Sequence, residues 1–163
     1  MGWAMTRLIG SLLPARFYHW LVVRLARLPL TPAQRLRHSV VFRHPLHPRG
    51  QHYLLVPTRY AAGILDLPRA EAQRLQEDVR GWIASAGWDS ALIVVNFGAY
   101  QETPFLHVHL IRASEQPAAP PAAGHWFVVE LDDDAGPVES GRRVVRYNAL
   151  EGAAVVTTEV NRA

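Results

Sequence analysis

Between residues 38 and 112 the chain alternates short apolar runs with one long amphipathic stretch, and this order restricts the fold more than any other feature. Four runs have the branched and aromatic side chains typical of β-strands: HSVVFR (38–43), HYLLVP (52–57), ALIVVNFG (91–98) and FLHVHLIR (105–112). Residues 67–88 have apolar side chains at helical spacing, with Pro68 near the start and Gly87 near the end. The order strand, strand, helix, strand, strand predicts an α+β fold with an antiparallel sheet and one long helix.

The flanking segments complete the predicted domain organisation. Residues 1–37 are expected to form an N-terminal amphipathic helical segment with a break at Pro14, and residues 38–113 the core. Residues 114–124 are rich in proline and alanine, which predicts a linker. Residues 125–163 are expected to form a C-terminal β extension with three short strands: WFVVELD, RRVVRY and AVVTTEV.

The amino-acid composition excludes several kinds of chemistry. All 17 basic side chains are arginine, and the chain has no lysine and no cysteine. The absence of cysteine excludes disulfide bonds, thiolate metal ligands and a thiol nucleophile. The absence of lysine excludes Schiff-base chemistry and a lysine-dependent phosphate loop. Nine arginines lie within the first 65 residues and the first carboxylate is Asp66, so this basic part is expected to attract phosphate groups.

The N-terminal 30 residues combine leucine and aromatic side chains with arginines. Arg16, Arg24 and Arg27 interrupt the apolar run, and no clear cleavage site follows, so neither a membrane span nor a secretory signal is expected. Two interpretations remain: an amphipathic helix lying on an anionic membrane, or a helix packed on the body of the protein or on a second subunit. We expect packing and a cytoplasmic location, with peripheral membrane association as the alternative.

Two histidines, His107 and His109, stand two residues apart in the predicted strand 105–112, so they share one face with Phe105. Three interpretations fit this pair: a metal site, buried histidines bound by backbone groups, or nucleophilic catalysis on phosphorus. In the catalytic interpretation one imidazole attacks and the other donates a hydrogen bond to the phosphoryl oxygens. The third ligand of a metal site would be one of three histidines: His44, His47 or His52.

The segment NFGAYQETPFLHVHLIR resembles the signature of the histidine triad (HIT) superfamily of nucleotide hydrolases and transferases. That signature is His-x-His-x-His followed by two apolar residues, with a glutamine four positions before the first histidine. Gln101 fits this spacing when the three triad positions are 105, 107 and 109. Asn96 and Gly98 match an Asn-x-Gly just upstream.

A second stretch extends the resemblance toward the N-terminus. QHYLLVP at 51–57 is similar to a strand of the same superfamily, and His52 stands where that strand carries a fourth histidine. The resemblance covers residues 38–112 and implies a HIT-like antiparallel sheet with one long helix.

The activity that the resemblance implies is nucleotide phosphohydrolysis or nucleotidyl transfer at an α-phosphate through a covalent phospho-histidine, with no metal or cofactor required. Nucleoside phosphoramidates and (di)nucleotide polyphosphates are the expected substrates. The catalytic residues would be His107, His109, Gln101 and His52. The expected substrate-binding residues are Asn96, Arg43, His44 and Phe105. His107 would be the nucleophile, held by a backbone carbonyl near position 105, and His109 would contact the phosphate.

The sequence departs from the superfamily pattern at two places. Phe105 replaces the first triad histidine, which the backbone role of that position tolerates. No acidic residue follows the first core strand to hold a ribose; His44 stands near that place, and Arg43 and Arg49 are expected to add phosphate contacts. Two expectations follow: either the nucleoside is held differently, or the substrate is not an ordinary purine nucleotide.

Two alternative functions remain open at this stage. One is a non-catalytic HIT-like module that binds nucleotides or phosphate. The other is a membrane-associated CDP-lipid pyrophosphatase. The YLLVPT segment is similar to a strand of HIT-like enzymes that cleave CDP-diacylglycerol. A basic amphipathic N-terminus would also suit a membrane substrate. The resemblance also implies a homodimer. Nucleic acid is not an expected partner, since no stacking aromatic motif accompanies the arginines.

Overall fold

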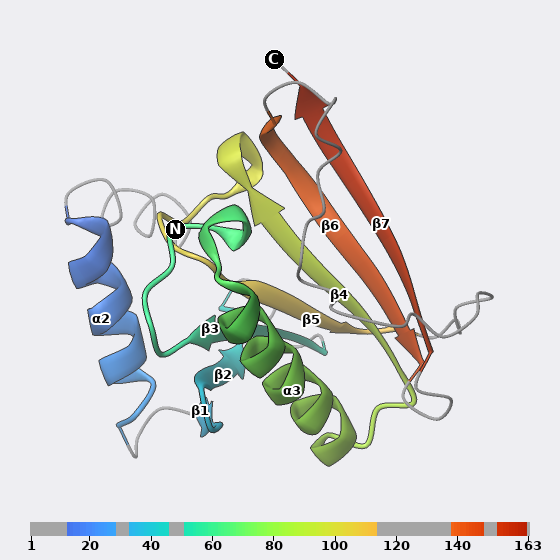
Figure 1. The fold of residues 1–163 in the computed structure, drawn as a ribbon. Helices are drawn as coiled ribbons and strands as arrows, with labels where there is room; N and C mark the ends of the chain where they lie inside the picture. Colours follow the sequence, from blue (N-terminus) through green and yellow to red (C-terminus); the bar gives the residue numbers. More distant parts are fainter. Residues whose placement is uncertain (1–12, 29–32, 46–50, 114–137, 149–152, 163) are drawn as a thin grey trace.

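The computed structural model describes residues 13–28, 33–45, 51–113, 138–148 and 153–162 (Figure 1). Its described strands form a single antiparallel sheet in the order β1-β2-β3-β5-β4-β6-β7. The strands are β1 (Ala33–Arg35), β2 (Ser39–Arg43), β3 (His52–Pro57), β4 (Ser90–Phe97), β5 (Val108–Arg112), β6 (Val138–Asn148) and β7 (Ala153–Arg162). The predicted α+β class, with an antiparallel sheet and one long helix, is confirmed. The predicted linker 114–124 and the predicted strand 126–132 lie outside the described residues.

The strand prediction for 105–112 is wrong at its start, because β5 begins only at Val108. The backbone N–H of Leu106 donates to the carbonyl of Ala61 at 2.8 Å, in the loop that follows β3. The chain at 105–107 is therefore bound to a loop and not to a neighbouring strand. The short strand β1 was not predicted, because its sequence Ala-Gln-Arg has no apolar alternation.

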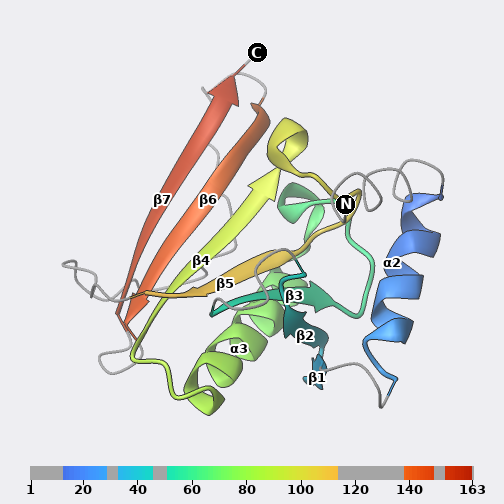
Figure 2. The same ribbon diagram turned by 180° about the vertical axis from the view of Figure 1, so that it is seen from behind.

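The C-terminal extension continues the core sheet. β6 contains the predicted strand RRVVRY, and β7 contains AVVTTEV. β6 pairs with β4 along its length, with Ile93 opposite Val145, and β7 pairs with β6. Figure 2 shows this long hairpin beside β4, at the edge of the sheet opposite β1. Val145 is buried in the same core as Ile93.

The long helix α3 (Arg69–Ser85) is shorter at both ends than the predicted 67–88. Pro68 is the N-cap residue, consistent with the preference of proline for the beginning of a helix. At the other end Gly87 has a positive φ of 65°, and the N–H of Trp88 donates to the carbonyl of Ile83 at 3.2 Å. This pair of features is a Schellman cap, in which glycine takes the left-handed conformation at no steric cost.

The main core lies between α3 and one face of the sheet. Alternate residues of each strand point to this face, so the apolar side chains of the central strands meet the apolar stripe of the helix. The fully buried members include Leu55, Val79, Ile83, Ile93, Val95, Val108 and Leu110. The residues between them on each strand, including the histidines, therefore point to the other face of the sheet.

The helix α2 (Ala15–Leu25) packs on that other face, beside β2 and β3 (Figure 1). Its buried residues Tyr18 and Val23 form a second core with Val40, Val56 and Phe105. The expected packing of the N-terminal helix on the body of the protein is confirmed, and the helix begins directly after Pro14. Within the described residues, no helix is long and apolar enough to cross a bilayer.

One polar contact attaches α3 to the sheet inside the main core. The buried carboxylate of Asp78 accepts hydrogen bonds from the hydroxyl of Ser39 and from the backbone N–H of His38, the latter at 2.9 Å. One donor is the first residue of β2 and the other directly precedes it, so this contact fixes the helix along that strand. A buried donor that loses its acceptor costs more free energy than the bond contributes.

We therefore expect Asp78→Ala to lower the free energy of unfolding by about 2 kcal/mol, because two partly or fully buried donors lose their acceptor. Urea unfolding followed by circular dichroism measures this change. Glu77→Ala, at the neighbouring exposed position of the same helix, is the control and should change stability by less than about 0.5 kcal/mol. Equal effects of the two substitutions would show that the Asp78 contacts contribute nothing specific.

Candidate active site

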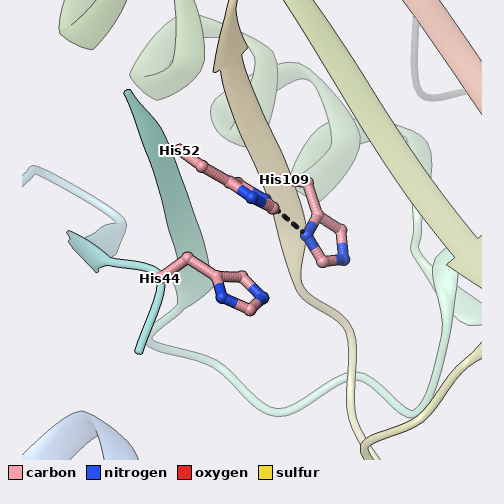
Figure 3. Close-up of side chains that lie close together, drawn as sticks. All are labelled: His44, His52 and His109. Carbon is pink, nitrogen blue, oxygen red and sulfur yellow. Dashed lines mark hydrogen bonds between the residues drawn. The ribbon is translucent and has the colours of Figure 1, made fainter. Parts of the chain in front are cut away.

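Three histidines from separate segments meet on the sheet face opposite α3: His44 after β2, His52 at the start of β3 and His109 in β5 (Figure 3). We call them the histidine cluster. Nε2 of His52 lies 3.0 Å from Nδ1 of His109. The ring of His44 stacks on that of His52, with 4.3 Å between centroids, and lies 5.8 Å from that of His109. The structure thus brings together residues that are far apart in sequence.

Backbone pairing explains how the cluster forms. The N–H of His44 donates to the carbonyl of His52 at 2.9 Å, which extends the β2–β3 ladder by one residue. The register of β3 and β5 places Leu54 opposite His109 and His52 opposite Ile111. His52 and His109 are therefore diagonal neighbours on one face, within reach of each other's side chains.

His107 lies beside the cluster and is almost fully buried, with 7% of its surface exposed. Its ring centroid is 4.9 Å from that of His109. Its Nδ1 lies 3.2 Å from the carbonyl oxygen of Phe105 and 2.8 Å from the hydroxyl of Thr103. A carbonyl only accepts hydrogen bonds, so in the tautomer that uses this contact the proton is on Nδ1 and the lone pair is on Nε2. The backbone carbonyl at position 105 therefore contacts His107 as the family resemblance implies.

Burial favours the neutral form of both His107 and His109. It lowers the pKa of His107, although the hydrogen bond to the Phe105 carbonyl opposes this effect. Burial also lowers the pKa of His109 to about 3, with smaller contributions from repulsion by His107, His52, His44 and Arg142 when these groups are positively charged. A neutral imidazole has a lone pair to offer to an electrophile or a metal.

The side chain of Phe105 belongs to the second core. It is 3% exposed and makes edge-to-face contacts with Tyr18 and His19 of α2, at centroid distances of 5.4 and 5.3 Å. The carbonyl of this residue contacts the imidazole of His107, and the phenyl ring lies edge-on to the same imidazole with 6.5 Å between centroids. The phenyl ring fills apolar space beneath α2, where a charged imidazole would be costly. This packing gives a physical reason for phenylalanine at position 105.

Gln101 and Thr103 shape the loop that precedes β5. The side-chain amide of Gln101 donates to the carbonyls of Ala62 and Thr103, at 2.6 and 2.8 Å. It therefore ties the loop after β3 to the loop that carries His107. Thr103 was not predicted as a site residue, although its hydroxyl contacts His107 directly. Its position four residues before the expected nucleophile, within the signature itself, was the available signal.

Arg142 was also missed, because it lies in the C-terminal extension. Its Nε donates to Oδ1 of Asn96 at 2.9 Å, across the pairing of β6 with β4. Asn96 is thus on the histidine side of the sheet, and its amide oxygen is bound to a guanidinium. The positive charge of Arg142 acts on His109. The extension therefore contributes a cation to this face of the core.

Arg43 lies on the opposite face of the sheet from the histidines. Its guanidinium donates to the hydroxyl of Tyr53 at 3.2 Å and lies 5.6 Å above that ring. With Tyr53 and Trp82 it lines a cavity of about 740 Å³ on the α3 side. The structure therefore does not bring Arg43 to the histidine cluster. Arg49, the other arginine expected to contact phosphate, lies outside the described residues.

Burial of neutral histidines predicts that stability falls in acid. The pKa values of His19, His107 and His109 are all lowered from 6.5 in the folded chain, mainly by burial. The unfolded chain then binds more protons below about pH 6.5, so folding stability is complete above that pH and is lost as the pH falls through it. His19 contributes through α2, where its Nε2 lies 2.8 Å from the carbonyl of Pro57.

We expect His19→Gln to weaken the acid dependence of the free energy of unfolding between about pH 7 and pH 5, because one group with a lowered pKa is removed. Urea unfolding at a series of pH values measures the slope. Gln34→Ala, at an exposed position that does not titrate, is the control and should keep the wild-type slope. An unchanged slope in His19→Gln would contradict the prediction.

Comparison with known proteins finds similar solved structures. No family model matches the chain, and no curated protein matches it. Among solved structures, a histidine triad protein from Clostridium difficile, determined at 0.95 Å resolution, is 21% identical. The match covers 61% of this chain and 94% of that chain, with a TM-score of 0.48.

Proposed function

We propose that the chain is a HIT-type phosphohydrolase or nucleotidyl transferase that acts at an α-phosphate through a covalent phospho-histidine on His107. The observation that carries this proposal is the contact between Nδ1 of His107 and the carbonyl of Phe105. It orients a buried neutral imidazole and reserves the Nε2 lone pair for attack. His109 lies beside the ring of His107. Gln101 forms a hydrogen bond to the loop that holds this ring.

In the first step of this mechanism, Nε2 of His107 attacks the α-phosphorus and the bond to the leaving group breaks. The new P–N bond places positive charge on the imidazole, and the carbonyl of Phe105 stabilises the proton that stays on Nδ1. If His52 donates from Nε2 to Nδ1 of His109, the proton of His109 is on its Nε2. That N–H is then the donor to a phosphoryl oxygen. Water attacks phosphorus in the second step, the P–N bond breaks and His107 is regenerated.

The expected substrates are nucleoside phosphoramidates and (di)nucleotide polyphosphates. Imidazoles and the guanidinium of Arg142 surround the site and favour an anionic group. His44, near the place where the family pattern has a ribose-binding acid, stacks on His52. A nucleoside would therefore meet a ring surface there in place of a carboxylate. This arrangement supports a substrate recognised mainly through its phosphate.

We expect His107→Ala to reduce turnover on the order of 10³-fold or more, because it removes the covalent nucleophile. Phosphorus NMR follows cleavage of three substrates by the wild type and the variant: an adenosine phosphoramidate, a diadenosine polyphosphate and a CDP-lipid. His38→Ala is the matched control and should retain activity, since His38 contacts Asp78 through its backbone N–H. A loss of turnover below tenfold in His107→Ala would show that His107 is not the nucleophile. Ligand binding without turnover by the wild type would identify a non-catalytic module.

The outer face of α2 favours a second candidate, a pyrophosphatase that acts on a CDP-lipid at a membrane. Four large apolar side chains of this segment are about half exposed: Phe17, Trp20, Leu25 and Leu28. Phe17 stacks on Trp20 with 5.6 Å between centroids, and Arg24 lies 5.5 Å from the Trp20 ring. Aromatic and leucine side chains beside arginines are typical of helices that lie in an anionic interface.

The same helix connects this surface to the site. Its inner face packs on Phe105 through Tyr18, and the carbonyl of Phe105 contacts His107. A membrane bound to the outer face of α2 would therefore lie one helix diameter, about 10 Å, from the second core. This proximity supports delivery of a phosphate that is linked to a lipid anchor.

For this candidate, we expect the double variant Phe17→Ser, Trp20→Ser to weaken binding to anionic vesicles about tenfold, because two half-exposed aromatic side chains no longer enter the interface. Sedimentation with phosphatidylglycerol vesicles measures the bound fraction, with phosphatidylcholine vesicles as the neutral comparison. Leu65→Ser, at an exposed leucine of the short helix η1 (Ile64–Asp66), is the control. Equal binding of the wild type and the double variant would contradict the membrane candidate.

A further inference from the structure

We propose that the histidine cluster, His44, His52 and His109, binds a divalent transition-metal ion, Zn²⁺ being the expected ion. Each imidazole offers one ring nitrogen, and these three atoms all lie within 4.8 Å of one another. Figure 3 shows the three rings gathered at this point from separate segments of the chain. The sequence left the third metal ligand open between several histidines, and the structure places two of them beside His109.

The distances fit a single ion. Zinc–nitrogen bonds are about 2.0–2.1 Å long, so two nitrogen ligands of a tetrahedral ion lie about 3.3 Å apart. The observed separation between Nε2 of His52 and Nδ1 of His109 is 3.0 Å. An ion would replace the shared proton between these two atoms after a small movement. His44 has to move further, and rotation of its side chain about χ1 and χ2 supplies such a shift.

The donor set selects the class of ion. Three imidazole nitrogens favour Zn²⁺, Cu²⁺ or Ni²⁺, whereas Mg²⁺ and Ca²⁺ prefer oxygen ligands. Three protein ligands also leave one tetrahedral position for water or for an anionic oxygen, as in catalytic zinc sites. An ion in this cluster would therefore have a coordination position for a phosphoryl oxygen.

The backbone around the cluster is well suited to hold a ligand set. His52 and His109 belong to paired strands, and the backbone hydrogen bond from His44 to His52 fixes the third position. Ligands on paired strands are held more precisely than ligands on isolated loops. His107 is not one of the three clustered histidines, and its Nδ1 contacts Thr103 and Phe105. The metal proposal therefore stands on its own geometry and does not require catalysis by His107.

The test measures metal binding directly on the full chain, without a histidine tag and after treatment with EDTA. Zn²⁺ titration in competition with a chromophoric chelator gives stoichiometry and affinity, and Co²⁺ gives a visible spectrum that reports coordination geometry. We expect one equivalent of Zn²⁺ and a tetrahedral Co²⁺ band for the wild type. His44→Phe keeps a ring on His52 but has no ligand atom, so its affinity should fall at least about tenfold.

Two further variants make the result specific. His44→Asp replaces the imidazole with another ligand and should bind Zn²⁺ more tightly than His44→Phe. His38→Ala removes a histidine outside the cluster and should bind as the wild type does. The proposal is overturned if the wild type binds less than one equivalent, if His44→Phe binds unchanged, or if His38→Ala loses affinity equally. Circular dichroism checks the fold of each variant. If His44→Phe does not fold, the Co²⁺ spectrum of the wild type decides: an octahedral spectrum overturns the proposal, and a tetrahedral spectrum supports it.

Discussion

The antiparallel pairing of β3 with β5 is the constraint on which the rest of the molecule depends. Its register places Leu55 opposite Val108 and Leu54 opposite His109. Because side chains alternate between faces, the same pairing sends Leu55 and Val108 into the core under α3 and the histidines to the other side. A shift of one residue would exchange the two sets, so hydrophobic burial fixes the register that assembles the site.

The two helices use the two faces of this sheet differently. α3 covers the core face with a wide apolar stripe, whereas α2 covers part of the histidine face through a smaller core that includes Phe105. This second core gives a physical reason for phenylalanine at position 105. The backbone of residue 105 contacts His107 while its side chain supports α2. One residue thus links the position of the N-terminal helix to the orientation of the candidate nucleophile.

Local patterns in the sequence predicted the parts of the fold that depend on neighbours along the chain. The periodicity of the apolar side chains was sufficient to predict β2, β3, β4 and α3. The two-residue spacing of His107 and His109 was sufficient to predict that their side chains lie on the same face. Other features depend on contacts between distant segments. Leu106 donates a hydrogen bond to Ala61 in a distant loop, and β5 begins only after this contact. Arg142 lies beside Asn96 because β6 pairs with β4. No single-sequence pattern encodes such pairings, which tertiary packing decides.

The charge around the histidine cluster connects its two proposed ligands. Arg142 adds a positive charge close to His109, and this charge disfavours a cation at the cluster when it binds alone. A phosphoryl anion bound beside the cluster would reduce that repulsion and take the open coordination position of the ion. Since coupling between two binding sites is reciprocal, the ion would strengthen phosphate binding by the same factor. Because residues 42–50 contain no acidic side chain, a bound phosphoryl anion would supply negative charge that this segment does not.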